Sequence, residues 1–244
     1  MRVLLTCMDC LHENGLPGFQ QVVVTVNDER FFKMTCPNGH HTLTVIQQPK
    51  HEILFELGMN ALVDGYPREA VTSFASCLEN FYEFCINQVS LHKGVDRAAL
   101  DIGWKGMAKL SERQLGGFVM LWLNYFGSAP TLLSDKSRSF RNRVVHQGYI
   151  PGLDETLAFG DEFVACVASN LRDMKNHMGD DLDAIFISEF TARAFSQNQR
   201  VTTQSIPTTI GWAELIKNET VNLRARLDVI DRNKVIFQWP KPDF

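Results

Sequence analysis

The chain contains no apolar run long enough to span a membrane and no extended apolar stretch at its N-terminus. The first residues, MRVLLTCMDC, offer only the four-residue run Val3 to Thr6 ahead of a pair of cysteines. A secretory signal needs an apolar core of about 7–15 residues, and a membrane helix needs about 20. We therefore expect a cytoplasmic protein with no membrane partner.

Several common catalytic signatures are also missing. The sequence has no glycine-rich phosphate loop ending in lysine, no Gly-x-Ser-x-Gly and no His-Glu-x-x-His. It has no internal repeat and no low-complexity tract. The usual fingerprints of nucleotide binding, serine hydrolysis and zinc proteolysis therefore give no guide to function.

An excess of positive charge is absent as well. The 244 residues include 24 basic and 28 acidic side chains, a formal net charge of -4, so any nucleic-acid binding must use a local basic patch. The 45% hydrophobic and 21% charged content is typical of a globular protein. The length suits one ordinary domain with a smaller appendage.

Cysteines are few, but half of the six lie within the first 36 residues. Cys7 and Cys10 form a CxxC pair, and Cys36 and His40 form a second pair at CxxxH spacing after an insert of 25 residues. Two such turns let four ligands converge on one tetrahedral ion. We therefore expect a zinc site made by Cys7, Cys10, Cys36 and His40.

This N-terminal pattern resembles the zinc-ribbon family, with His40 where a fourth cysteine often sits. His41 is a competing ligand and His12 a weaker one. Four protein ligands leave no open coordination position, so the zinc is expected to be structural. A segment of about 48 residues is too small to fold by apolar burial alone, and a metal would stabilise it. The three later cysteines are interpreted as buried free thiols.

The periodicity predicts three segments of different character. Residues 1–48 read as strands, with 21–26 pairing with 31–35 and 42–46 around a turn at 27–30. Residues 50–179 read as a helical bundle. Residues 180–244 read as a C-terminal extension with one helix and a β-hairpin, whose strands are 223–229 and 235–239. The predicted helices cover 51–62, 68–91, 115–126, 131–147, 153–178 and 182–196, and 115–126 is apolar nearly all round and expected to be buried.

A basic cluster on the helix at 131–147 is the strongest indication of chemistry. Arg141 and Asn142 are followed by His146, and Lys136, Arg138 and Arg143 lie close by. At about 100° per residue, Asn142 and His146 share a face, whereas Arg141 and His146 lie about 140° apart. One copy of the helix therefore makes a poor active site, but two copies across a two-fold axis would place two histidines and two arginines around one phosphate.

The string Phe140-Arg141-Asn142-Arg143-Val144-Val145-His146 resembles the signature of the HEPN superfamily (higher eukaryotes and prokaryotes nucleotide-binding). That motif is Arg, a polar residue that is commonly Asn, three variable residues, then His, late in a small helical bundle. The resemblance covers about residues 50–179. Glu79, on the upstream helix, stands where many members carry an acidic residue facing the motif. The expected fold is thus mainly α: a HEPN-like bundle with a small N-terminal β zinc ribbon and a C-terminal helix plus β-hairpin.

The resemblance implies a homodimeric, metal-independent endoribonuclease that yields a 2′,3′-cyclic phosphate and a 5′-hydroxyl. His146 would be the general acid and base, and Arg141 would hold the scissile phosphate. Asn142 would orient either of these groups, while Glu79 would anchor Arg141 or tune His146. Prokaryotic members are often toxins or antiphage effectors.

Two other interpretations stay open. Many HEPN-like domains bind RNA or nucleotides, or act as scaffolds, without cleaving RNA. A third possibility is a toxin regulated by a protein partner, such as a nucleotidyltransferase that modifies it.

Overall fold

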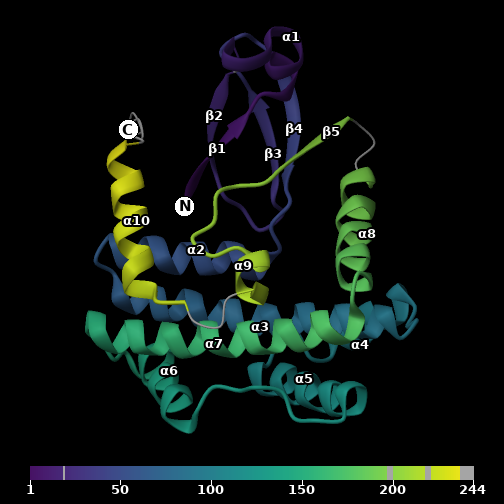
Figure 1. Ribbon diagram of the computed structural model, residues 1–244, viewed down its shortest axis with the longest axis vertical. Helices are drawn as coiled ribbons and strands as arrows, with labels where there is room; N and C mark the ends of the chain where they lie inside the picture. The colour runs from purple at the N-terminus through teal and green to yellow at the C-terminus, as the bar shows by residue number, and fades with distance from the viewer. Residues whose placement is uncertain (19, 197–199, 218–220, 237–244) are drawn as a thin grey trace. The chain divides into compact units, whose positions relative to one another are not determined.

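The computed structural model describes residues 1–18, 20–196, 200–217 and 221–236 and divides the chain into two compact units (Figure 1). Unit 1 comprises Met1–Lys50 together with Asp183–Thr208, and unit 2 comprises His51–Leu182 together with the chain from Thr209. The predicted C-terminal extension, 180–244, is therefore shared between the two units. Residues Asp183–Thr208 belong to the unit with the N-terminal strands, and the described residues from Thr209 belong to the unit with the helices.

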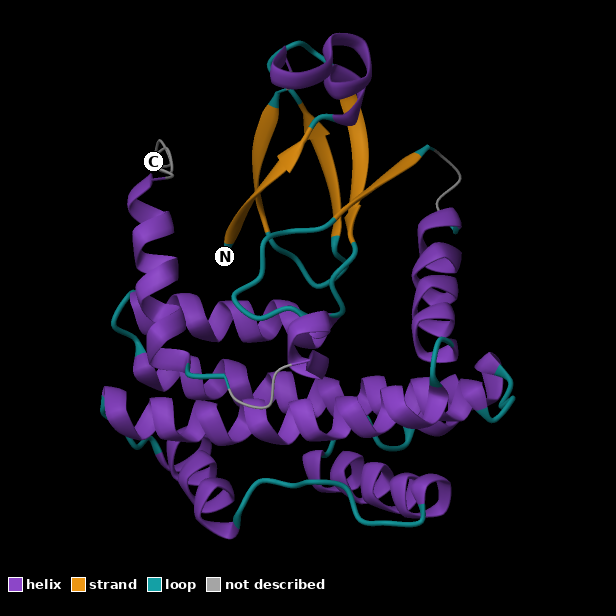
Figure 2. Ribbon diagram, viewed as in Figure 1, coloured by secondary structure: helices purple, strands orange, loops and turns teal. Residues whose placement is uncertain are grey.

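Unit 1 is built from two small sheets and the helices α1 and α8. In the first sheet β1 and β2 are antiparallel, and in the second β4 lies between an antiparallel β3 and a parallel β5. The elements are β1 (Arg2–Thr6), α1 (Met8–Gly18), β2 (Gln21–Thr25), β3 (Phe31–Thr35), β4 (His41–Ile46), α8 (Asp181–Phe195) and β5 (Val201–Gln204). The strands appear in orange in Figure 2.

The structure corrects two expectations for this unit and adds one strand that was not predicted. Segment 21–26 pairs with β1 and not with 31–35. Residues 8–18 form a helix where we expected strands and turns. The added strand is β5. It lies in a polar segment without an alternating apolar pattern, so no local signal predicts it. It forms by pairing with β4, which is distant in the sequence.

Unit 2 is a helical bundle centred on two long helices that lie side by side, α3 (Pro67–His92) and α7 (Leu153–Met178) (Figure 1). Helix α3 also packs against α5 and α6. The remaining helices of this unit are α2 (Lys50–Val63), α4 (Arg97–Lys105), α5 (Ser111–Phe126), α6 (Asp135–Gln147), α9 (Trp212–Lys217) and α10 (Leu223–Ile236).

Aromatic stacking fills the centre of the bundle. The rings of Phe55, Phe74 and Phe163 stack on one another with centroids 5.3 to 5.9 Å apart. Two glycines allow this packing, since a Cβ at Gly58 would collide with Phe74, and one at Gly160 would collide with Leu223. The mainly helical class and the predicted long helices are confirmed. The prediction that helix α5 is buried is wrong in part, because Met120 is 58% exposed and Leu123 is 39% exposed.

The predicted C-terminal hairpin is wrong. Residues 223–236 form helix α10, while residues 237–239 of the second predicted strand lie outside the described part of the chain. Asn222 starts the helix, because its side-chain Oδ1 accepts the Ala225 amide at 3.0 Å. Leu223 is fully buried, and its amide donates to Asp161 of α7 at 3.0 Å. The alternation of apolar side chains in this segment therefore led to a wrong strand prediction for what is a helix with an Asn222 N-cap.

In the part of the chain that the structure describes, no helix combines the length and the apolar character needed to cross a membrane.

Candidate functional sites

Helix α6, which carries the Arg–His motif, is fixed at both ends. At its start the Ser134 hydroxyl accepts the Ser137 amide at 3.2 Å. Glu162 of α7 accepts the Ser134 amide and the Ser137 hydroxyl, both at 2.5 Å. At its end Gly148 adopts a left-handed conformation with φ of 72°, which glycine adopts without strain. These contacts fix the two ends of the helix.

The apolar side of α6 faces the bundle, as the periodicity predicts. Val144 is fully buried, and the Phe140 ring lies 5.5 Å from that of Phe159. Asn142 and His146 are both exposed. The face that they share is therefore open to solvent in a single chain.

Arg141 is held between two partners. Its guanidinium forms an ion pair with Glu79 of α3 and donates to the Asn142 Oδ1 at 3.0 Å. The side chains of Arg141 and Glu79 are only 19% and 30% exposed. The fold thus joins three of the four residues named from the motif. Of the two roles considered for Glu79, the geometry matches anchoring of Arg141.

His146 stands apart from this group. It is exposed, and within the described residues its imidazole makes no hydrogen bond or ion pair. The local basic charge is also partly compensated. Arg138 pairs with Asp135, and the Arg143 guanidinium stacks 4.4 Å from the centre of the Tyr149 ring. One chain therefore presents an anchored guanidinium and a separate, unengaged imidazole.

The four predicted metal ligands come together in unit 1. The sulfurs of Cys10 and Cys36 lie 3.6 Å apart, and the His40 Nδ1 lies 3.7, 3.2 and 3.6 Å from the sulfurs of Cys7, Cys10 and Cys36. All four ligand atoms lie within 4.8 Å of one another. The three cysteines are buried and free, and a sulfur separation of 3.6 Å is far beyond the disulfide length of about 2.05 Å. The cluster can hold a metal ion.

The second imidazole nitrogen of His40 distinguishes it from its neighbour. The Nε2 lies 3.2 Å from a carboxylate oxygen of Glu13, an arrangement that orients a histidine whose other nitrogen faces a metal. His41 instead is exposed and contacts the Thr35 hydroxyl at 3.0 Å. Neither His41 nor His12 belongs to the ligand group. Sequence spacing gave no sign of Glu13, because its contact to His40 forms only in the fold.

Backbone amides favour the thiolate form of one ligand. Burial disfavours ionisation of Cys36, but the amides of His40 and Asn38 point at its sulfur and lower the net pKa to about 7. The turn is closed by a hydrogen bond of 2.8 Å from the Gly39 amide to the Cys36 carbonyl. The backbone of this turn therefore favours the thiolate form that a metal ligand needs.

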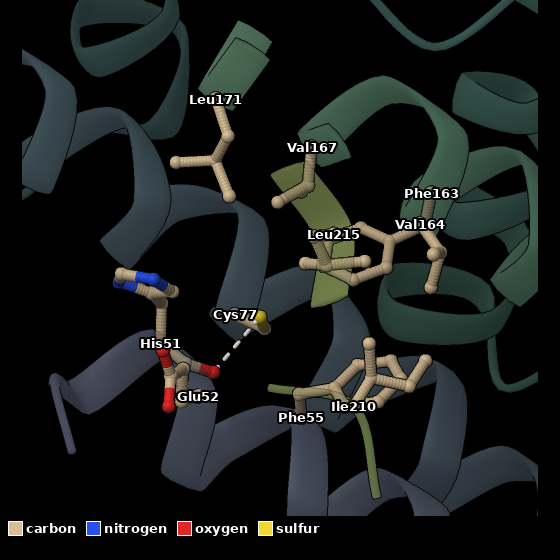
Figure 3. Close-up of a pocket in the computed structure, with 10 residues that line it drawn as sticks. All are labelled: His51, Glu52, Phe55, Cys77, Phe163, Val164, Val167, Leu171, Ile210 and Leu215. Atoms are coloured by element: carbon tan, nitrogen blue, oxygen red, sulfur yellow. Dashed lines mark hydrogen bonds between the residues drawn. The ribbon is translucent and has the colours of Figure 1, made fainter. Parts of the chain in front are cut away.

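A small cavity lies in unit 2, away from the Arg–His motif (Figure 3). Its lining is mostly apolar, but His51, Glu52 and Cys77 stand at one end, where the thiol donates to the His51 carbonyl at 3.0 Å. Burial, then the nearby Glu56, raises the pKa of Glu52 to about 7. The cavity volume of about 30 Å³ admits one or two water molecules.

The fold and these sites define a class: a mainly helical protein with a Cys3His group that can hold a metal ion. Comparison of the chain with protein-family models, with curated proteins and with solved structures gives no match.

Proposed function

We propose that this protein is a metal-independent endoribonuclease of the HEPN type that acts as a homodimer. The observation that carries the proposal is the anchoring of Arg141 by Glu79 and Asn142, together with an exposed and unengaged His146 on the same helix. A guanidinium pre-oriented by a carboxylate binds a phosphate with little loss of side-chain entropy. The exposed face with Asn142 and His146 is available to a second copy of the helix.

In the proposed reaction, His146 takes the proton of an RNA 2′-hydroxyl. The freed oxygen attacks the adjacent phosphorus, and the bond from phosphorus to the 5′-oxygen breaks. The same histidine of the partner subunit returns a proton to that oxygen. Arg141 stabilises the negative charge that grows on the phosphate. The products are a 2′,3′-cyclic phosphate and a 5′-hydroxyl.

Digestion of RNA by the zinc-loaded protein in a buffer without added metal tests this proposal. Loss of a general acid–base lowers the rate by about 10²- to 10⁴-fold, so we expect that decrease for His146→Ala. His12→Ala is the matched control, because His12 is also exposed but lies in unit 1. Mass spectrometry should find a cyclic phosphate on the product. Equal cleavage by wild type and His146→Ala would refute the proposal.

The same assay separates the rival functions. If wild type binds RNA without cutting it, and His146→Ala binds equally, the protein is a binding or scaffold module. A role as a toxin or antiphage effector would follow from cleavage of cellular or phage RNA during expression. A shift in the intact mass of the purified protein, together with a co-purifying protein, would indicate regulation by a nucleotidyltransferase partner.

We further propose that the ion in unit 1 is zinc and that its role is structural. Zinc–sulfur bonds of about 2.3 Å and zinc–nitrogen bonds of about 2.0–2.1 Å would separate the ligand atoms of a regular tetrahedron by about 3.6–3.8 Å. Four of the six separations between ligand atoms are 3.2 to 3.7 Å, close to these values, and all six are within 4.8 Å. Three thiolates also favour zinc over harder ions. With four protein ligands the ion supplies stability to unit 1, and no step of the proposed reaction uses it.

A further inference from the structure

A strained arginine ends the turn between β2 and β3. Among the described residues other than glycine, Arg30 is the one with a positive φ, at 59°. Glycine is the usual residue in this conformation, because a Cβ crowds the backbone there. Arg30 is thus held in an unfavourable conformation by its surroundings, as often occurs at functional sites.

The guanidinium of Arg30 is largely buried but incompletely bonded. Its Nη1 donates to the Gln48 carbonyl at 2.6 Å, whereas its Nε is buried and has no hydrogen-bond partner. A buried N–H without a partner costs stability unless a water molecule or an ion occupies the space beside it. One donor of Arg30 therefore remains to be satisfied.

A second arginine lies close to the first. Arg193 of α8 donates to the Glu29 carbonyl, and its guanidinium lies 5.3 Å from the centre of the Phe31 ring. Burial, and after it the charge of Arg193, lowers the pKa of Arg30 to about 10. Both guanidiniums are anchored by neutral carbonyl oxygens, and in the described part of the chain neither forms an ion pair. Their positive charges are therefore only partly compensated.

The surrounding charges define what the arginines can bind. Asp28 is engaged with Lys50 at 2.5 Å, and Glu29 offers the remaining carboxylate. The group thus has three positive side chains and two carboxylates, a net charge of one positive unit. The cations are Arg30, Arg193 and Lys50, and the carboxylates are those of Asp28 and Glu29. A single negative charge with several acceptor oxygens balances this group, and a phosphodiester has that charge and that acceptor geometry.

We propose that Arg30 and Arg193 form a binding site for a backbone phosphate of single-stranded RNA, separate from the Arg141–His146 motif. The assignment to RNA rests on the proposed function, whereas the phosphate chemistry rests on unit 1 alone.

Fluorescence anisotropy with a labelled 2′-O-methyl oligouridylate and the zinc-loaded full-length protein tests the proposal. This probe lacks the 2′-hydroxyl nucleophile, so it reports binding whether or not the protein is a nuclease. We expect Arg30→Gly and Arg193→Gln each to weaken binding about tenfold or more. Each should also reduce the salt slope by about 0.7, the value for one phosphate contact on a single strand. Glycine relieves the backbone strain at position 30, which offsets the lost hydrogen bond to Gln48, so this variant should keep its melting temperature and metal content.

Arg200→Gln is the matched control, since Arg200 belongs to the same unit, is 75% exposed and pairs with Asp9. It should leave the affinity within about twofold of wild type, because exposed pairs contribute little. Equal losses in all three variants, or no binding by wild type, would overturn the site. Displacement of the probe by micromolar AMP or inorganic phosphate would overturn the assignment to RNA in favour of a free phosphate compound. Binding that depends on Arg30 in a protein that never cuts RNA would reject the nuclease and keep the site.

Discussion

The contact between Glu13 and His40 leads to a quantitative prediction about the metal site. The carboxylate lies 3.2 Å from the His40 Nε2 and holds the imidazole with its Nδ1 toward the three sulfurs. Loss of such an outer partner typically weakens metal binding by 10- to 100-fold. That factor corresponds to about 1.4–2.7 kcal/mol. Glu13→Gln should therefore bind zinc with an affinity lower by this factor.

The same free-energy difference should appear in the free energy of unfolding of the metal-bound protein. An ion that binds only the folded state stabilises it in proportion to the logarithm of its affinity, so at saturating metal Glu13→Gln should lose about 1.4–2.7 kcal/mol. Competition with a chromophoric chelator measures the affinity, and thermal melting at fixed free zinc measures the stability. Without metal the wild type and the variant should melt at nearly the same temperature, because the exposed contact alone contributes little.

Two histidine variants decide whether the ligand set is correct. His40→Ala should bind metal far more weakly, whereas His41→Ala should retain it, because His41 contacts only Thr35 in the described structure. Equal metal loss in both variants would refute the assignment of His40. A purified wild type without bound metal, or with Cys10 and Cys36 joined in a disulfide, would refute the site as a whole.

Three further predictions concern unit 2. Gly160→Ala should destabilise the fold by about 1–3 kcal/mol in chemical denaturation, because the added Cβ collides with Leu223 and thus tests the docking of α10. Glu52→Gln should reduce the dependence of stability on pH. The folded pKa of this acid is about 7 and the unfolded value 4.5, so its contribution is complete below pH 4.5, declines as the pH rises to about 7 and amounts to about 1–3 kcal/mol. Glu79→Gln should lower RNA cleavage more than RNA binding, measured as separate rate and affinity, because Arg141 then loses its anchor.

Each of these predictions has a control or a contrary outcome. Gly116→Ala should be neutral or stabilising by up to about 1 kcal/mol, because a Cβ there meets no atom within 4 Å. If both alanine variants behave alike, the packing against α10 is wrong. An unchanged pH profile in Glu52→Gln would show that this acid is not buried in the folded state. An unchanged cleavage rate in Glu79→Gln would remove any role for the ion pair to Arg141.

The sequence pattern was enough to predict a structural feature where residues close together in the chain encode it. The helices 68–91 and 153–178 were predictable, since their apolar stripes recur every three to four residues and glycine or proline marks their ends. The grouping of Cys7, Cys10, Cys36 and His40 was predictable because the CxxC and CxxxH spacings themselves create two turns. The helix 223–236 was not, because its alternating side chains fit a strand and only the Asn222 cap and the burial of Leu223 favour a helix.

The sequence by itself determined the spacing of the candidate residues: three cysteines and His40, and the Arg141–His146 segment with Glu79 as a candidate partner. Only the tertiary structure decided which partners they meet. It joined Glu79 to Arg141 across 62 residues, Glu13 to His40, and Arg193 to the turn at Arg30. The physical reason is that a turn or a helix face depends on residues a few positions apart. A charge pair between distant segments exists only after the chain has folded.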